Sequence, residues 1–340
     1  MHEALDTVWD SEGFLESMTQ KGELLRQGHA AGLEAAEPIE AAGLAFVGMG
    51  FSGIAGDLVM DALGRASPWP MMSIKHYKLP RQVRSDWHVL AISHSGQTEE
   101  TVALVEQAQR RGCAVTGFST GGKLGQRVDV VPQPGPLQPR AATGHTWASI
   151  LGYFQGAGIL EDVPIDGMRR AVAGVDRANG LHVPYEDNEA LQWAHALRDK
   201  VPMIYSTPAF ASMGRAFRGL LNENAKKLAF DLVLPEANHN DLTAWGDPNR
   251  AQFAAVCLHH AEQHPQLAKR IRYMRQRYAE WHVPWHDHMA PPIHTLDDHL
   301  IEQARAWQFL EYVSIYTALL RYQDPADITE IKALKAALAD

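Results

Sequence analysis

Short apolar runs alternate with amphipathic segments in the first half of the chain. Runs that end in a glycine or serine turn predict strands, and the segments behind them carry apolar residues at helical spacing. The predicted strands are LAFVGMG, MMSIKHY, HVLAISHS and CAVTGFS, and the predicted helices are SGIAGDLVMDAL and TEETVALVEQAQRR. This alternation is typical of a parallel sheet that is covered by helices.

The same alternation restarts near residue 190. A helix over NEALQWAHALRDK precedes the strand VPMIYS, and a helix over FASMGRAFRGLLNENAK precedes the strands FDLVLP and AQFAAVCL. Phe210, Met213, Phe217 and Leu221 share one face of the second of these helices. Further helices are predicted over QLAKRIRYMRQRYAE, HLIEQARAWQFLEYVSIYTALLRY and ITEIKALKAALAD. The chain is therefore expected to be an α/β protein with two halves of similar design.

A chain of 340 residues is long enough for two domains. Apolar residues at helical spacing predict a leading helix over 14–37, and four prolines predict a loop over 132–140. The segment ATGHTWASILGYFQGAGIL, which follows this loop, is expected to be the helix that closes the first half. We expect an N-terminal helical segment (1–40), a first domain (41–160) and a second domain that includes the C-terminal helices (161–340).

Charge and composition exclude several classes of partner. A net charge of −9 without a basic run argues against nucleic acid. No stretch approaches about 18 consecutive apolar residues, so no membrane span is expected. The N-terminal MHEALDTVWDSEG lacks the apolar core of a signal peptide. The two cysteines, Cys113 and Cys257, lie in apolar runs and indicate buried thiols in a reducing, cytoplasmic compartment rather than a disulfide framework.

The first glycine-rich turn is GMGFSG at 48–53, between a predicted strand and a predicted helix. This spacing matches a dinucleotide-binding turn, but that interpretation needs an acidic residue about 20 residues further on. The next predicted strand ends in IKHYK and offers no carboxylate, which weakens the case for a nicotinamide cofactor. Two alternatives stay open: a tight turn without a ligand, or a turn at Gly50 and Ser52 that binds an anion.

A second turn, SHSGQTEET at 93–101, favours the anion. Ser93, Ser95 and Thr98 surround a glycine where a strand meets a helix, so hydroxyls and free amides converge at the positive end of the helix dipole. A plain helix cap, the alternative, needs only one of these hydroxyls. Glu99 and Glu100 would repel a phosphate and are expected to point away from it. Both turns follow strands of a parallel sheet, where such folds bind ligands, and together they suit a sugar phosphate.

Six motifs of the chain resemble those of a known family. GMGFSGIAGD, SHSGQTEET, TGGKL, QPRAA, NENAK and PEANHN occur in the order and spacing of the bifunctional phosphoglucose/phosphomannose isomerases, members of the sugar isomerase (SIS) domain superfamily. The chain resembles this family from about residue 40 onward. The resemblance implies two SIS domains, each a parallel sheet flanked by helices on both faces. It also implies interconversion of glucose 6-phosphate, with mannose 6-phosphate as a further candidate substrate, and fructose 6-phosphate through an enediol.

The resemblance also implies roles for individual residues. Glu223 would move a proton between C1 and C2, Arg140 would stabilise the enediolate, and His239 would open the sugar ring from the neighbouring subunit of a homodimer. The phosphate would lie at the two turns, against Gly50, Ser52, Ser93, Ser95 and Thr98. The family uses neither a metal nor another cofactor.

These residue types suit the reaction independently of the resemblance. A carboxylate can accept and return a proton, an imidazole titrates near neutral pH, and a guanidinium stays charged beside a developing oxyanion. Each also has a plain structural alternative. Glu223 could pair with Lys227 on a helix surface, His239 could be a polar loop residue between two asparagines, and Arg140 could be a solvated linker charge.

Two departures from the family pattern motivate a second hypothesis, a non-catalytic protein that binds sugar phosphates with a regulatory role. Phe51 replaces a glycine of the first turn, where a ring would narrow the approach to the sugar. Tyr316 stands where the family has a lysine.

The histidine-rich segment WHVPWHDHMAPPIHTLDDH, residues 281–299, is a candidate metal site. Its prolines predict a loop with solvated side chains, although H-D-H could place two imidazoles on one side of a strand. The segment offers no defined third and fourth ligand, so no metal is expected there. Its histidines are His282, His286, His288, His294 and His299.

Overall fold

The computed structural model describes residues 5–64 and 67–338, which form two compact units. The first-sheet unit comprises 20–173 and 293–305, and the second-sheet unit comprises 5–19, 174–292 and 306–338. Each unit therefore combines segments that are distant in the sequence. The domain boundaries expected from the sequence at residues 40 and 160 stay a prediction.

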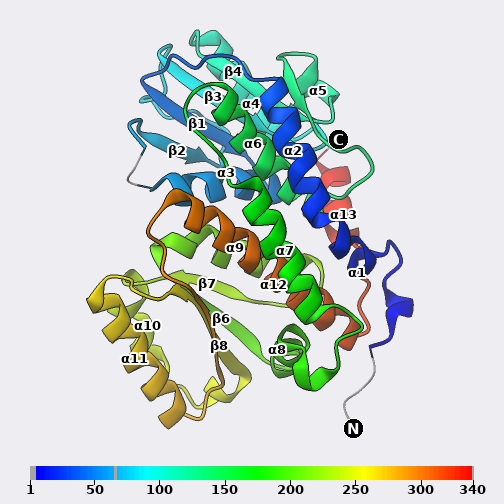
Figure 1. Cartoon of the computed structure of the whole chain (residues 1–340), viewed down its shortest axis with the longest axis vertical. Coiled ribbons are helices and arrows are strands. Elements are labelled where there is room, and N and C mark those ends of the chain that lie inside the picture. Colours follow the sequence, from blue (N-terminus) through cyan, green and yellow to red (C-terminus); the bar gives the residue numbers. More distant parts are fainter. Residues whose placement is uncertain (1–4, 65–66, 339–340) are drawn as a thin grey trace. The chain divides into compact units, whose positions relative to one another are not determined.

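The sheet of the first unit is entirely parallel, in the order β2-β1-β3-β4-β5 (Figure 1). The central strands β1 and β3 are buried along their whole length, as their continuous apolar runs require. The strands are β1 (Gly43–Gly48), β2 (Met71–Ile74), β3 (Trp87–Ile92), β4 (Ala114–Ser119) and β5 (Val130–Pro132).

Helices cover both faces of this sheet. On one face, Val89 packs with Leu104 of α4 (Glu99–Arg110) in a buried apolar cluster. On the other face lie α3 (Gly50–Leu63) and α6 (Thr143–Gly156), where the ring of Phe46 meets that of Phe154 at 6.2 Å. The predicted helices and strands of this half are confirmed.

The leading helix predicted over 14–37 is observed as α1 (Phe14–Ser17), a 3-10 turn, and α2 (Lys21–Glu34). In Figure 1, α2 runs along α6. Glycines allow the two backbones to approach closely, because a Cβ added at Gly32 would lie 1.9 Å from the Ser149 carbonyl oxygen.

The sheet of the second unit is also parallel, in the order β7-β6-β8-β9. Its strands are β6 (Val201–Ser206), β7 (Phe230–Val233), β8 (Phe253–His260) and β9 (Trp285–Ala290). The expectation of a solvated loop over the histidine-rich segment is wrong for β9. Nearby prolines suggested a loop, but the rings of His286 and His288 pack against Trp193 and Phe309 inside the unit.

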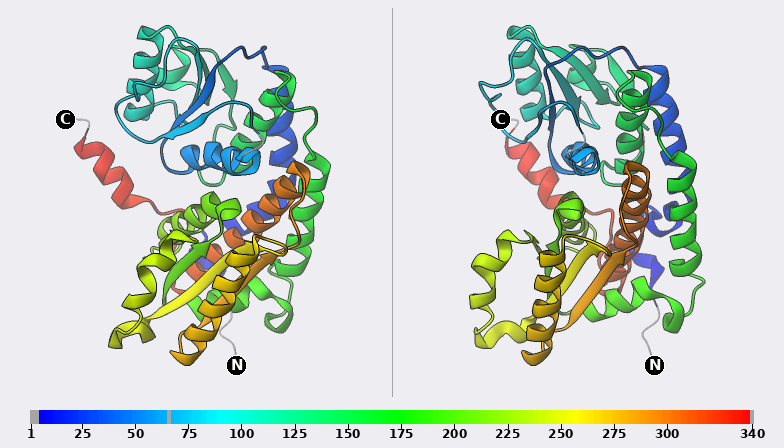
Figure 2. Two further views of the ribbon diagram at one scale, coloured as in Figure 1. Left: turned by 90° about the vertical axis from the view of Figure 1, so that its left-hand side faces the viewer. Right: turned by 60° about the vertical axis from the view of Figure 1, so that its left-hand side comes forward.

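Helices lie on both faces of this sheet. Gly214 of α9 (Ala211–Glu223) lies against Ser206, whereas Tyr278 of α11 (Pro265–Glu280) bonds the hydroxyl of Tyr205 on the other face. Figure 2 shows α11 running along the sheet in both views. The remaining helices are α5 (Gly122–Gly125), α7 (Ile165–Asn179), α8 (Glu189–Leu197), α10 (Asp241–Ala244), α12 (Leu296–Leu320) and α13 (Thr329–Ala337). Among the described helices, none combines the length and apolar content that a membrane crossing requires.

Candidate functional site

The two turns of the first-sheet unit follow neighbouring parallel strands. The first turn leaves β1 and enters α3 at Gly50, and the second leaves β3 and enters α4 at Glu99. The backbone amide of His94 in the second turn donates to the Ser52 hydroxyl in the first, at 3.2 Å. The sheet topology therefore brings the two predicted anion-binding turns together.

The N-terminus of α4 lacks a side-chain cap. Thr98 occupies the N-cap position, but its hydroxyl oxygen accepts a hydrogen bond from the Ser93 hydroxyl at 2.9 Å and makes no capping bond. The alternative of a plain hydroxyl cap is therefore wrong. The first N–H groups of α4 stay available to a ligand oxygen, and the helix dipole favours a negative charge there.

The exposure of the hydroxyls differs across the second turn. Ser93 is fully buried, Thr98 is half-buried, and Ser95 is exposed while its oxygen accepts from the Gln97 amide at 3.2 Å. Ser52 is half-buried in the first turn, where neighbouring Gly50 has φ 52° and is exposed. This difference in exposure suits a ligand that contacts the exposed Ser95 and the N-terminus of α4. The less exposed hydroxyls of Ser93 and Thr98 would then help to hold the turn in place.

A third turn, which the sequence did not single out as functional, supports the second one. It follows β4 at Ser119, and its Gly121 carbonyl would lie 1.9 Å from a Cβ added at Gly96. The amide of Leu124 donates to the Gly96 carbonyl at 3.0 Å. The TGGKL motif therefore packs against the SHSGQ turn and supports it. Its two consecutive glycines are the sequence feature that could have indicated this close contact.

The carboxylate of Glu99 accepts a hydrogen bond from the Tyr77 hydroxyl at 2.5 Å. This bond raises the pKa of Tyr77 to about 12, so the phenol stays protonated. Glu99 is thereby engaged by the segment that follows β2.

Arg140 lies just before α6, at the end of the proline-rich loop. The alternative of a solvated linker charge is wrong, because this side chain is only 1% exposed. Its Nη1 donates to Gln138 Oε1 at 2.5 Å. A buried guanidinium held in this way is a fixed positive charge.

Glu223 is the last residue of α9 and is half-buried. The side chains around it bind backbone: Asn222 donates to the Lys227 carbonyl at 2.7 Å, and Lys226 donates to the carbonyl of Glu223 at 2.9 Å. The fully buried Asn224 donates to the Ser314 hydroxyl at 2.9 Å. The amides and the lysine of NENAK therefore make hydrogen bonds at the C-terminal end of α9. These bonds fix the backbone that carries the carboxylate of Glu223.

The alternative of an ion pair between Glu223 and Lys227 is wrong. Lys227 is 8% exposed and its ammonium donates instead to the carbonyl of Arg198 at 2.9 Å. Burial lowers the pKa of Lys227 to about 8.

His239 lies in a different part of the second-sheet unit from Glu223. Since α9 returns antiparallel to the strands, Glu223 lies toward the amino end of β7, whereas His239 follows its carboxyl end. Four strand residues alone span about 13 Å at the usual rise. His239 is exposed, and neighbouring Ala237 packs on the face of the sheet that α11 covers.

The two departures from the family pattern are both buried. Tyr316 is fully buried in α12 and its hydroxyl donates to the Asn179 carbonyl at 2.5 Å, so it is a core residue. Phe51 is 4% exposed in the first turn of α3. A lysine from another segment lies at the loop that follows α12, because the Lys226 ammonium donates to the Asp324 carbonyl.

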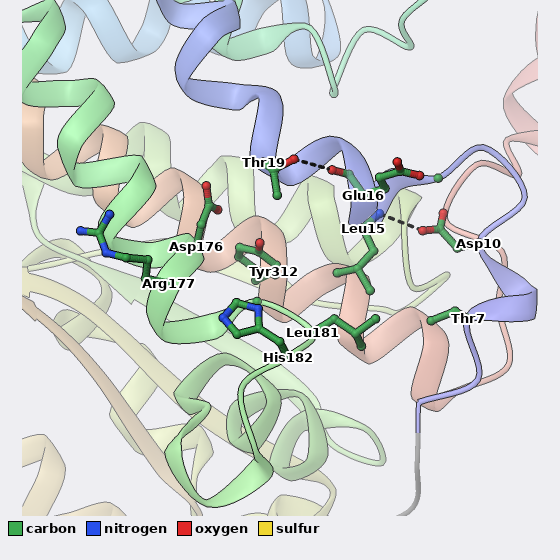
Figure 3. Close-up of a pocket in the computed structure, with 12 residues that line it drawn as sticks. Thr7, Asp10, Leu15, Glu16, Thr19, Asp176, Arg177, Leu181, His182 and Tyr312 are labelled. Atoms are coloured by element: carbon green, nitrogen blue, oxygen red, sulfur yellow. Dashed lines mark hydrogen bonds between the residues drawn. The ribbon is translucent and has the colours of Figure 1, made fainter.

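A cavity of about 560 Å³ lies within the second-sheet unit (Figure 3). Asp10 and Glu16 come from the N-terminal segment, and Asp176, Arg177 and Tyr312 line the opposite side. Asp10 is engaged by the backbone amides of α1, as one dashed line in the figure shows. The lining of this cavity includes no residue that the sequence predicted to be functional.

Comparison with known proteins defines the class. The family model of the bacterial phospho-glucose isomerase C-terminal SIS domain matches residues 186–338. A solved structure of a hypothetical protein from Thermus thermophilus superposes with a TM-score of 0.73 at 13% identity, over 97% of this chain and 90% of that one. The chain is an α/β protein of two parallel sheets flanked by helices, with the fold of SIS domains.

Similarity of sequence then gives the family. The bifunctional phosphoglucose/phosphomannose isomerase of Caldicellulosiruptor bescii is 29% identical over 304 residues, which cover 86% of this chain and 88% of the relative. The protein of the same name from Pyrobaculum aerophilum is 31% identical over 229 residues, or 65% of this chain and 67% of the relative. The chain belongs to the bifunctional phosphoglucose/phosphomannose isomerase family.

Proposed function

We propose that this protein is an aldose–ketose isomerase that interconverts glucose 6-phosphate, and mannose 6-phosphate as a second aldose, with fructose 6-phosphate. The observation that carries the proposal is Glu223, a half-buried carboxylate whose backbone is fixed by Asn222 and Lys226. Such a group combines partial access with a defined position, as a base in proton transfer needs.

The reaction we propose begins with the open-chain aldose. The carboxylate of Glu223 takes the proton from C2, the electron pair forms a C1–C2 double bond, and the C1 carbonyl oxygen becomes an enediolate. Glu223 then returns the proton to C1, while the proton of the C2 hydroxyl passes to the negatively charged C1 oxygen, so that C2 becomes the ketone and C1 carries a hydroxyl. The two aldoses differ only at C2, so both give the same enediol, and the net reaction consumes no other reagent.

Arg140 is the cation that we assign to the enediolate. Its guanidinium is buried and held by Gln138, so little reorganisation is needed when negative charge develops. The phosphate group is assigned to the uncapped start of α4, with Gly50, Ser52, Ser93, Ser95 and Thr98 around it.

His239 is assigned to ring opening in the active site of a second copy of the chain. Glu223 and His239 of one chain lie at opposite ends of β7, and His239 is exposed. A homodimer in which each copy donates His239 would supply both groups to one sugar. Mixing the inactive variants Glu223→Gln and His239→Ala tests this assignment, because mixed dimers contain one site with both native residues. Recovery of about a quarter of the wild-type activity is expected, and no recovery on subunit exchange contradicts the assignment.

The activity itself is tested with a panel of hexose and pentose phosphates. The wild-type protein, incubated in D₂O with glucose 6-phosphate or mannose 6-phosphate, is expected to give fructose 6-phosphate with deuterium at the exchanged carbon. Thermal stabilisation by these sugar phosphates without product or exchange would instead support the non-catalytic, regulatory alternative.

We also propose a reducing, cytoplasmic location, which is supported by two buried free thiols, Cys113 and Cys257.

A further inference from the structure

Three potential metal ligands lie together on one face of the second sheet. Cys257 and His259 alternate along β8 and therefore point to the same side, and Asp287 of β9 is the direct register partner of Cys257. The ligand atoms of these three residues all lie within 4.8 Å of one another. This cluster, Cys257, His259 and Asp287, is separate from every residue assigned above.

The imidazole of His259 has a free nitrogen directed at this cluster. Its Nε2 is buried without a hydrogen-bond partner and lies 3.4 Å from Asp287 Oδ1, while the residue is 5% exposed. A buried polar nitrogen without a partner is costly, and its presence needs an explanation. Imidazole binds a metal through the lone pair of such a ring nitrogen.

Gln263 lies on the other side of the same ring. Its Nε2 is 3.3 Å from His259 Nδ1, and its Oε1 is buried without a partner. A rotation of this amide by half a turn places Oε1 at Nδ1 and lets Nδ1–H donate to it. This exchange leaves the Nε2 lone pair free for a metal, the usual arrangement behind a histidine ligand.

We propose that Cys257, His259 and Asp287 form a binding site for a divalent transition-metal ion of the Zn²⁺ type. Sulfur, imidazole nitrogen and carboxylate oxygen are the ligands that Zn²⁺ takes, and water completes a tetrahedral site with three protein ligands. The Cys257 thiol loses its proton to solvent when it binds the ion, because a coordinated thiol is deprotonated.

Two neighbours of Asp287 compete with the ion for its carboxylate. The Trp285 indole donates to Oδ1 at 2.9 Å, and the Arg275 guanidinium bonds Oδ2. The Arg275 side chain is 52% exposed, so it can swing into solvent, and Asp287 at 20% exposure then offers a route of entry. Since a guanidinium repels a cation, removal of Arg275 tightens metal binding.

The proposed metal site is on the face of the sheet that α11 covers. Cys257 lies in one apolar cluster with Met274 and Tyr278 of α11, whereas Glu223 ends a helix on the opposite face. The inference therefore does not depend on the proposed isomerase activity, and its test is metal binding.

The test is a titration of the full-length, reduced protein with Co²⁺, monitored by the thiolate-to-cobalt charge-transfer absorption, followed by competition with Zn²⁺. We expect one Co²⁺ per chain, displaced by one Zn²⁺. Cys113→Ser is the matched control, since it removes the other buried thiol and should keep the signal. Absence of the charge-transfer band in the wild-type protein would overturn the proposal.

Variants assign the ligands and their neighbours. Cys257→Ser is expected to abolish the band, and His259→Gln, which keeps both thiols, to weaken Co²⁺ binding more than about 100-fold. Arg275→Gln is expected to tighten it by about tenfold, as removal of a nearby positive charge should. A band that persists in Cys257→Ser, or unchanged affinity in His259→Gln, would contradict the site.

Discussion

Gly96 offers a sharp test of how the second of the two predicted anion-binding turns is built. Gly96 has φ 64°, and a Cβ at this position would lie 1.9 Å from the Gly121 carbonyl oxygen. A side chain in this left-handed conformation costs about 1–2 kcal/mol, and crowding against backbone adds about 1–3 kcal/mol. Gly96→Ala should therefore lower the free energy of unfolding by about 3 kcal/mol.

The same substitution should also reduce activity. Real Cβ contacts essentially never fall under 3.0 Å, so the turns at Gly96 and Gly121 must separate by about 1 Å. A displacement of this size at a binding group costs about 100-fold in catalytic efficiency. Because the amides that we propose to bind the phosphate lie in this turn, the loss is expected mainly in kcat/KM for the sugar phosphate.

Denaturant unfolding and steady-state kinetics measure these two effects, and two other glycines provide controls. Gly121 has φ 126° with open space around its Cβ position, so Gly121→Ala adds strain without a clash. Gly135→Ala adds neither and should change stability by less than about 0.5 kcal/mol. The reasoning is refuted if Gly96→Ala is as stable as Gly135→Ala, and the phosphate assignment is refuted if stability falls while kcat/KM does not.

Two lysines near the end of α9 give further predictions, with exposed Lys332→Met as the control for both. Lys226→Met removes the ammonium that bonds the Glu223 carbonyl, so kcat should fall about tenfold because the base is less well positioned, with a smaller change in KM. For Lys227, burial lowers the pKa from 10.5 to about 8, so the unfolded chain binds more protons between these pH values. Wild-type stability should therefore rise through this range by up to about 3 kcal/mol relative to Lys227→Met. Denaturant unfolding at pH 7 and pH 10 measures this difference, and a pH-independent difference would contradict it.

Apolar periodicity predicted the fold well where a strand or helix has a single buried face or is buried throughout. The strands β1 and β3 and the helix α9 were identified for this reason. Helix α7 was left unassigned, although Met168, Val172 and Val175 are buried at helical spacing and could have revealed it. The strand β9 was missed because its histidines pack on aromatic rings, a contact that a polar residue type does not reveal.

Sequence reasoning about the site identified residues of suitable chemistry but failed for burial. The turn with Ser93, Ser95 and Thr98 was assigned to an anion from its hydroxyls and its glycine, and this assignment stays a prediction. The burial of Arg140 and Tyr316 could not be predicted, because both are polar residues whose neighbours come from distant segments. The cluster of Cys257, His259 and Asp287 could likewise not be predicted from the sequence, because it depends on the register between β8 and β9.

The central claim is that Glu223 carries the proton between C1 and C2. It is tested most directly by the turnover of Glu223→Gln with glucose 6-phosphate, with binding of the substrate measured separately. Glu236→Gln is the matched control, an exposed glutamate in the same unit. Turnover should fall by about 1,000-fold or more in Glu223→Gln with little change in sugar-phosphate affinity, and stay near wild type in Glu236→Gln. A Glu223→Gln variant that turns over as fast as Glu236→Gln would contradict the claim.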